Sequence, residues 1–172
     1  MNVTKVRIEL IQANITTMDV HAIVNAANES FLGGGGVDGS IHCGAGPELL
    51  KECLTLGGWN TGQAKITYGY NLKIKFVIHT VGPVWRDGTN GAPQLLVSCY
   101  RNCLQLAVAN QIQIIVFTSI STGVYGYLIM QASQIAVREV RNFLVKNPLI
   151  KQISFVCFSS EDLYVYKSLL QK

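Results

Sequence analysis

The chain alternates short apolar stretches with longer segments in which apolar residues recur at helical spacing. In residues 5–10, charged side chains separate apolar ones at every second position, which is the pattern of a strand with two different faces. Further strands are predicted at residues 22–25, 64–67, 75–81, 112–118 and 153–158. Because apolar strands lie between helices, we expect the sheet to be covered on both faces.

Segments of helical periodicity lie between and after these strands. They occupy residues 38–57, 93–110, 130–146 and 160–170. Glycine and proline interrupt the first of them near Gly44–Pro47, and Ser160 is placed to cap the last one ahead of two acidic residues. The alternation predicts a three-layer α/β/α sandwich with a mixed central sheet, formed by a single domain over residues 1–172.

Composition narrows the functional classes. The 172 residues suit one domain, and an apolar content of 49% with only 14% charged residues argues against disorder. The net charge of +4 is spread along the chain, which suits a phosphorylated small ligand better than a nucleic-acid groove. We therefore expect no specific nucleic acid as a partner.

The N-terminus and the cysteines favour the cytoplasm. The N-terminus lacks the continuous apolar core of a secretory signal, and no apolar run approaches the roughly 18 residues of a membrane span. Five cysteines, an odd number, fit reduced thiols. Cys99 and Cys103 are interpreted as small buried apolar residues, because metal-ligand spacing is absent. We expect a cytoplasmic protein with no membrane partner, no metal site and no cofactor.

The most informative stretch is a run of four glycines, Gly33–Gly36, between a buried strand and the predicted start of a helix. Glycine lets the backbone approach a ligand closely, and the free N–H groups at a helix start attract an anion. Residues 34–39 also satisfy G-x-G-x-x-G, but these glycines do not follow the strand directly, and the next acids lie on a helix. A nicotinamide-dependent redox enzyme is therefore disfavoured, and a merely flexible connection is the remaining alternative.

A second loop, Ser119–Tyr127, follows another apolar strand and again combines small residues, backbone N–H groups and hydroxyls. Parallel strands end at the same edge of a sheet, where ligands commonly bind. Two such loops could hold a diphosphate from opposite sides through backbone donors. Tyr125 is placed to pack on a sugar, unless its role is only structural.

These loops and several other motifs resemble those of MacroD-type macrodomains. The matching stretches are Asn25–Asn28, Gly33–His42, Glu52–Cys53, Thr61–Gly62, Ile78–Trp85, Ser119–Tyr127 and Phe155–Phe158. The resemblance covers essentially the whole chain in unbroken order. It implies a three-layer fold that binds ADP-ribose with the diphosphate between the two glycine loops. It also implies an enzyme that removes ADP-ribose from acidic side chains and deacetylates O-acetyl-ADP-ribose.

The resemblance further implies where the ligand and the chemistry lie. It places Asn25, Asn28 and Asp38 at the distal ribose as the catalytic residues. The other ligand contacts that it implies are Asn14, Ile15, Gly35, Gly36, Val37, Ser121, Thr122, Gly123, Val124, Tyr125 and Phe158. Hydrolysis at the anomeric carbon develops positive charge, which the Asp38 carboxylate could stabilise while it orients a water. Asn28 would fix a ribose hydroxyl, and a helix cap is the alternative role for Asp38.

The chain departs from the family pattern at three places. Asn14 stands in Ala13–Thr16 where the family has Asp in Gly-Asp-Ile-Thr. We expect its amide oxygen to accept the same hydrogen bond from the adenine amino group without charge assistance, at some cost in affinity. His21 replaces an Asp, and Leu128 replaces a Pro, which is expected to loosen the second loop. The histidines are interpreted as structural, with His79 a hydrogen-bonded core residue.

The sequence therefore predicts a hydrolase of ADP-ribosyl esters that works as a monomer. Its partners would be ADP-ribose and, as substrates, mono-ADP-ribosylated proteins or O-acetyl-ADP-ribose. The main alternative is a reader module that binds ADP-ribose without turnover, because one fold can serve both roles.

Overall fold

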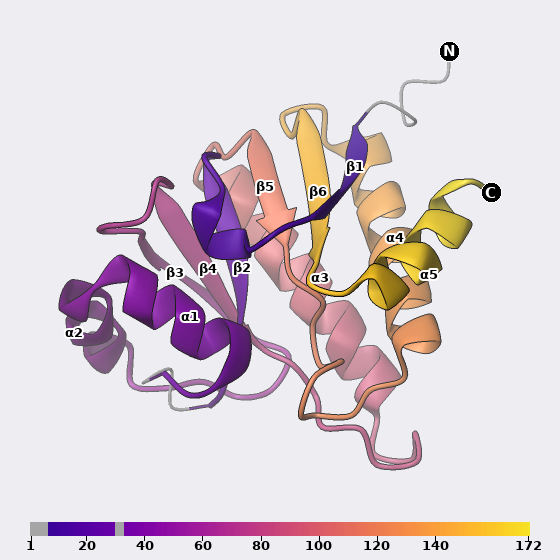
Figure 1. The fold of residues 1–172 in the computed structure, drawn as a ribbon, viewed down its shortest axis with the longest axis horizontal. Coiled ribbons are helices and arrows are strands. Elements are labelled where there is room, and N and C mark those ends of the chain that lie inside the picture. The colour runs from indigo at the N-terminus through magenta and orange to yellow at the C-terminus, as the bar shows by residue number, and fades with distance from the viewer. Residues whose placement is uncertain (1–6, 30–32) are drawn as a thin grey trace.

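The computed structural model describes residues 7–29 and 33–172, and a β-sheet lies at its centre (Figure 1). In the described residues the sheet has six strands: β1 (Ile8–Gln12), β2 (Ala22–Ala27), β3 (Ala64–Tyr68), β4 (Phe76–Val81), β5 (Ile114–Phe117) and β6 (Gln152–Cys157). Their order across the sheet is β1-β6-β5-β2-β4-β3. All neighbouring strands run parallel except β3 and β4, which are antiparallel. The prediction of a mixed sheet is confirmed.

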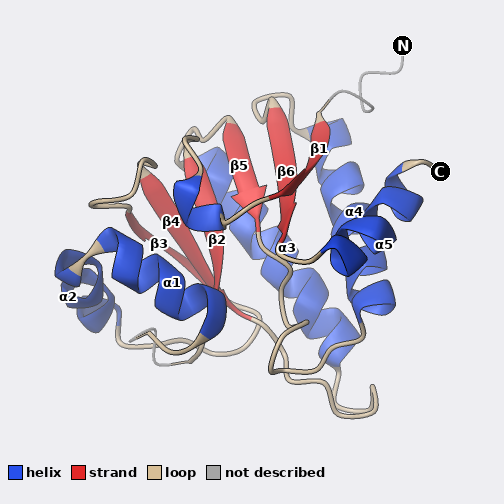
Figure 2. Ribbon diagram, viewed as in Figure 1, coloured by secondary structure: helices blue, strands red, loops and turns tan. Residues whose placement is uncertain are grey.

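Helices cover both faces of this sheet (Figure 2). One face carries α1 (Gly36–Ala45) and α2 (Pro47–Leu56), and the other carries α3 (Ala92–Ala109), α4 (Ile129–Lys146) and α5 (Ser160–Leu170). A short 3-10 turn, η2 (Ile15–Thr17), follows β1. The arrangement is the predicted three-layer α/β/α sandwich. No helix in the described part of the chain is long and apolar enough to cross a membrane.

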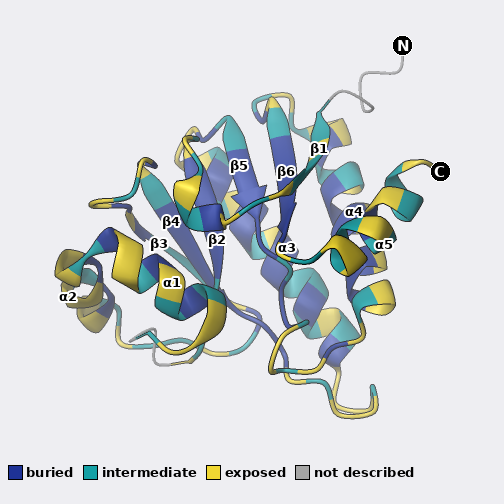
Figure 3. Ribbon diagram, viewed as in Figure 1, coloured by how far each residue is buried: buried dark blue, intermediate teal, exposed yellow. Residues whose placement is uncertain are grey.

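The strands are largely buried (Figure 3). Their apolar side chains contribute to two separate cores, one on each side of the sheet. In β2, Ala22 and Val24 pack toward α3 and α4, whereas Ile23 and Ala27 pack toward α1 and α2. Side chains alternate along a strand, so the residue two positions after Ile23 and two before Ala27 lies on the same face of β2 as they do. That residue is Asn25, a completely buried polar side chain on an otherwise apolar face.

Two helix boundaries show how local chemistry sets the element ends. The break predicted near Gly44–Pro47 falls at Gly46, whose φ of +87° ends α1 just before the proline that starts α2. The predicted cap of the last helix is wrong by one residue. Ser159 rather than Ser160 is the N-cap of α5, because its hydroxyl accepts a hydrogen bond of 3.1 Å from Asp162 N.

The carboxyl ends of the parallel strands gather at one edge of the sheet. β1 continues past its predicted end to Gln12, beside Cys157 at the end of β6, while residues 5 and 6 of the predicted strand lie outside the described residues. Ala27 at the end of β2 lies beside Val81 at the end of β4. The loops that follow these strands and β5 therefore emerge on the same side, which is the usual place for a ligand in an α/β sheet.

Candidate functional site

Asn25 and Asp38 form a buried pair near the carboxyl edge of the sheet. Asn25 comes from β2, and Asp38 lies in the first turn of α1 with only 5% of its surface exposed. The amide Nδ2 of Asn25 donates a hydrogen bond of 2.7 Å to Asp38 Oδ1. The structure thus brings two of the three predicted catalytic residues into direct contact, and their catalytic role stays a prediction.

The Asp38 carboxylate does not act as the cap of α1. The N-cap is Gly35, and Asp38 Oδ1 accepts from Asn25 and lies 3.5 Å from His42 Nε2, one helical turn further on. Asp38 Oδ2 and Asn25 Oδ1 are buried, and neither accepts a hydrogen bond from the residues that the structure describes. A buried acceptor without a partner costs about 1–3 kcal/mol. Two such atoms on one bonded pair are typical of a site that a ligand or a water completes.

His79 supports Asn25 from the neighbouring strand. The two residues are register partners in β4 and β2, and His79 Nδ1 lies 3.1 Å from Asn25 Nδ2. On its other side, His79 Nε2 lies 2.9 Å from Thr67 Oγ1 on β3. Burial, with a smaller contribution from the nearby His42, lowers the pKa of His79 to about 3. The imidazole is therefore neutral at pH 7, and its partner is a residue of the candidate site.

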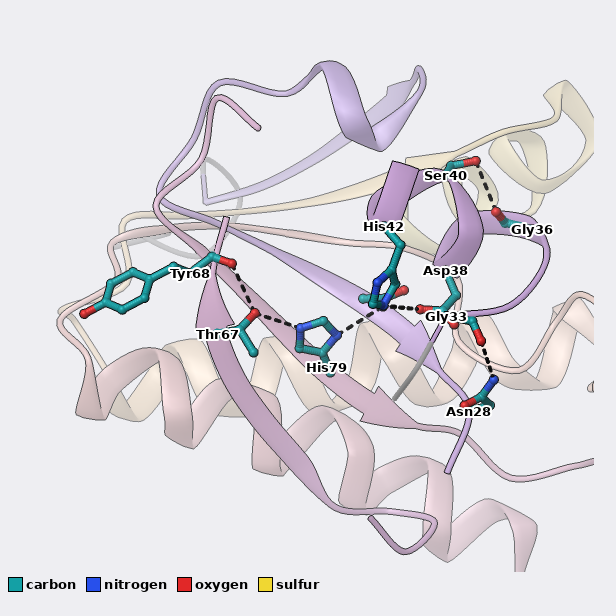
Figure 4. Close-up of polar contacts among 10 residues, drawn as sticks. Asn28, Gly33, Gly36, Asp38, Ser40, His42, Thr67, Tyr68 and His79 are labelled. Carbon is teal, nitrogen blue, oxygen red and sulfur yellow. Dashed lines mark hydrogen bonds and ion pairs between the residues drawn. The ribbon is translucent and has the colours of Figure 1, made fainter. Parts of the chain in front are cut away.

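Asn28 ties the first glycine loop to the end of β2. Its Nδ2 donates a hydrogen bond of 3.0 Å to Gly33 O (Figure 4). A Cβ at Gly34 would lie 3.3 Å from Asn28 Nδ2 and 3.5 Å from Asp38 Oδ2, so Gly34 packs beside both side chains. A Cβ at Gly39 would lie 2.3 Å from Gly34 O, which excludes any larger residue there without a backbone shift. The glycines therefore let the loop pack closely on α1 next to the predicted catalytic residues.

The start of α1 presents an open helix N-terminus. Gly35 is the N-cap without a side-chain hydrogen bond, and Gly36 begins the helix with a φ of +60°. Both are exposed, Val37 is half-buried, and no described atom lies within 4 Å of a Cβ built at either glycine. The first N–H groups of a helix lack partners within it and carry its positive dipole end. These three predicted residues are therefore placed where an anion would bind.

In the second loop, Ser121 has an uncommon backbone conformation and packs against the segment that follows β4. Ser121 has a φ of +68°, which is uncommon for a residue with a side chain, and its buried hydroxyl finds no partner in the described residues. A Cβ at Gly82 would come within 2.2 Å of Ser121 Oγ. Trp85 N donates a hydrogen bond of 2.8 Å to Tyr125 O. The loop is thus shaped by contacts with a segment that the sequence prediction did not assign to the site.

A cavity of about 440 Å³ lies between the end of β2 and the second loop. Its lining comes from the end of β2, the connection between α2 and β3, the segment after β4 and the second loop: Asn28, Glu29, Thr61, Val81, Gly82, Val84 and Tyr125. This volume falls within the range of small-molecule sites, roughly 300–1,000 Å³. Thr61 Oγ1 donates a hydrogen bond of 3.3 Å to Glu29 Oε1. Of the lining residues, the sequence prediction includes only Asn28 and Tyr125.

Asn14, Ile15 and Phe158 follow the neighbouring strands β1 and β6. Ile15 is buried, whereas Phe158 is 88% exposed. Asn14 Oδ1 accepts hydrogen bonds from Thr16 N at 3.0 Å and from Thr16 Oγ1 at 2.7 Å, as the N-cap of η2. The oxygen that we expected to accept from adenine is therefore already used within the chain. The remaining group of this side chain, Nδ2, is a donor.

The remaining predicted residues of the second loop are more exposed. Val124 is fully exposed and Gly123 is exposed, while Thr122 Oγ1 donates a hydrogen bond of 2.8 Å to Ser119 Oγ. Leu128 is the N-cap residue of α4 with a φ of −66°, which proline also adopts, so the backbone follows a path open to either residue.

The sequence offered no reason to assign a site role to Thr61, Thr67, His79 or Gly82, although Thr61, His79 and Gly82 lie in stretches that resemble the family. The sequence feature that could have indicated Thr67 and His79 is a polar residue inside a predicted strand. That signal becomes specific only when the strand order is known, because Asn25 and His79 meet through the pairing of β2 with β4.

The low pKa of His79 predicts a pH dependence of stability. In the unfolded chain the imidazole binds a proton below its ordinary pKa of 6.5, whereas in the native state it stays neutral until about pH 3. Stability should therefore fall as the pH drops from 6.5 toward 3, by up to about 1.4 kcal/mol per pH unit from this residue. Urea denaturation at pH 7, 6, 5 and 4 should give a steeper loss for the wild type than for His79→Gln. Equal slopes would contradict the assignment, because carboxylates contribute to both proteins alike.

Comparisons with known proteins identify a family that matches most of the chain. A family model described as Macro domain matches residues 24–136, which include both loops. A macro domain-containing protein of Chlorobaculum tepidum is 56% identical over 165 residues, and the alignment covers 96% of each chain. An O-acetyl-ADP-ribose deacetylase of Salmonella typhimurium is 51% identical over 168 residues, with 95% of this chain and 94% of the relative covered.

Solved structures show the same fold. The Trypanosoma brucei macrodomain in complex with ADP has a TM-score of 0.92 at 43% identity, and the match covers 97% of this chain and 70% of that one. A mutant of the Oceanobacillus iheyensis macrodomain with ADPR has a TM-score of 0.92 at 42% identity, over 100% and 98% of the two chains. The family match spans more than half of the chain, and near-complete relatives share about half of its residues. This chain belongs to the Macro domain family.

Proposed function

We propose that the chain binds ADP-ribose and hydrolyses ADP-ribosyl esters. The substrates would be O-acetyl-ADP-ribose and proteins that carry mono-ADP-ribose on an acidic side chain. The observation that carries the proposal is the buried Asn25–Asp38 pair, which has two unsatisfied acceptor atoms, one of which, Asp38 Oδ2, lies beside Gly34 of the first glycine loop. Relatives named O-acetyl-ADP-ribose deacetylase, at about half identity over nearly the whole chain, support the same activity.

The diphosphate would lie between the two loops. On one side, the N–H groups at the start of α1, from Gly35, Gly36 and Val37, would donate to the phosphate oxygens, since no side chain caps this helix end. On the other side, the backbone N–H groups that follow Ser121, whose conformation is left-handed, would donate to the anion. Neither loop contains a lysine or an arginine, so backbone dipoles would supply the binding. The exposed ring of Phe158 is available to stack on the base.

The distal ribose would then lie near Asn28, at the cavity that Tyr125 also lines. Asp38 Oδ2 would accept a hydrogen bond from the attacking water and hold it toward the ester. Where the bond to the anomeric carbon breaks, the same carboxylate stabilises the positive charge that develops on the sugar. Water is the only second reactant, and the products are ADP-ribose and a carboxylic acid.

Replacement of Asp38 tests the hydrolytic role. Wild-type protein should release ADP-ribose from a protein mono-ADP-ribosylated on glutamate and acetate from O-acetyl-ADP-ribose. Asp38→Ala should slow release by about a hundredfold or more, because a positioned acid or base typically contributes that much. ADP-ribose binding, measured by calorimetry, should weaken far less. Glu48→Ala is the matched control, since Glu48 is an exposed acid on α2 whose ion pair with Lys51 lies outside the site.

Two results would contradict the hydrolase. Tight ADP-ribose binding without release from either ester would leave a reader module in its place. Equal rates for wild type and Asp38→Ala would remove the carboxylate from the chemistry.

Asn14→Asp is predicted to strengthen ADP-ribose binding. One carboxylate oxygen can keep the two hydrogen bonds from Thr16, and the second becomes the acceptor that the amide lacks. An added hydrogen bond to a charged acceptor should increase the affinity about tenfold, measured by calorimetry. Asn142→Asp, on an exposed position of α4, makes the same charge change and should leave the affinity unaltered. Weaker or unchanged binding by Asn14→Asp would count against contact between this residue and the base.

A further inference from the structure

A line of buried polar residues crosses the sheet face that α1 and α2 cover. It begins with Thr67 on β3 and His79 on β4 (Figure 4). It continues through Asn25 on β2 to Asp38 on α1. None of the four is more than 5% exposed. The neighbours of His79 on the same face of β4, Val77 and Val81, belong to the apolar core. Burial of a polar side chain at each of these four positions costs free energy of folding unless its hydrogen bonds are satisfied.

One arrangement of the protons satisfies all the hydrogen bonds along this line. Thr67 Oγ1 donates its single proton to Tyr68 O at 3.2 Å, so it accepts from His79 Nε2 at 2.9 Å. A neutral imidazole that carries its proton on Nε2 has an acceptor at Nδ1. Asn25 Nδ2 then donates one hydrogen to His79 Nδ1 and the other to Asp38 Oδ1.

This arrangement also fixes which way the Asn25 amide points. A flipped amide would place Oδ1 against the lone pair of His79 Nδ1 and against the Asp38 carboxylate, so three acceptors would face one another. The observed orientation instead turns Asn25 Oδ1 away from both partners. That oxygen and Asp38 Oδ2 are both buried, and no described residue donates a hydrogen bond to either.

We propose that Thr67 and His79 are positioning residues for the reaction. Thr67 selects the Nε2–H tautomer of His79, and His79 in turn holds the Asn25 amide in the orientation that donates to Asp38. The proposal rests on the function proposed above, because it assigns the catalytic work to Asn25 and Asp38. Neither Thr67 nor His79 lines the cavity of about 440 Å³ beside Asn28 and Tyr125. Their effect is therefore expected on the rate of the chemical step rather than on ligand binding.

Thr67→Val and Thr67→Ser form the matched pair that tests this proposal. Valine keeps the shape and removes the hydroxyl that accepts from His79 Nε2, so the Nδ1–H form becomes accessible. Nδ1–H would face the Asn25 amide and favour the flipped orientation, which takes the donor away from Asp38. We expect Thr67→Val to lower kcat about tenfold with KM and the ADP-ribose Kd nearly unchanged. Serine keeps the hydroxyl and should restore kcat to near the wild-type value.

Nitrogen-15 NMR of the His79 ring provides a readout that does not depend on turnover. Wild type and Thr67→Ser should show the Nε2–H tautomer, and Thr67→Val should show a mixture with Nδ1–H. The side-chain amide signals of Asn25 should be single and sharp in the wild type and broadened in Thr67→Val. A wild-type ring protonated on Nδ1 would overturn the proposal without any variant, so it stays testable even if a variant does not fold.

The activities of the two Thr67 variants and of the wild type also decide the proposal. An unchanged kcat for an active Thr67→Val protein would overturn the proposal, and so would equal losses for valine and serine, which would indicate packing rather than the hydroxyl. If the wild type hydrolyses no ADP-ribosyl ester, the proposed function fails. The tautomer and the amide signals would still show in that case whether Thr67 and His79 fix Asn25.

Discussion

The site depends on one interaction, the hydrogen bond between the Asn25 amide and the Asp38 carboxylate. Both groups are buried, and a carboxylate removed from water needs donors to replace its hydration. Asn25 supplies one, and the first turn of α1 adds its favourable dipole. The rest of the site follows from this contact, because Asp38 can reach Asn25 only when α1 begins directly above β2. The glycine run before α1 and Gly39 within it make that close approach possible.

Both loops depend on glycines that allow close packing. The first loop packs Gly34 beside Asn28 and Asp38, and the second places Ser121 against Gly82. In both cases a glycine on one segment allows close approach by the other. An anion held by such loops would be bound by the backbone, and the net charge of +4 would contribute only a general attraction.

Much of this organisation could be predicted from the sequence, because local patterns determine it. The alternation of apolar strands and helices predicted the three layers, and Gly44–Pro47 predicted the break between α1 and α2. The position of Asp38 in the first turn of α1 follows from the glycine run. Contacts between strands distant in the sequence could not be predicted. The partnership of Asn25 with His79, and that of His79 with Thr67, require the order β2-β4-β3, which no local pattern encodes. The use of Asn14 as a cap likewise depends on the turn that follows it.

The location of the ADP-ribose site is the central claim, and nitrogen-15 NMR titration with ADP-ribose tests it most directly. The side-chain amide signals of Asn25 and Asn28 should shift together with the backbone signals of Gly35, Gly36 and Gly123, with one common affinity. A second cavity of about 410 Å³, which Asn102 and Gln105 help to line, provides the comparison. Saturable shifts at those two amides, with Asn25 and Asn28 unchanged, would contradict the account.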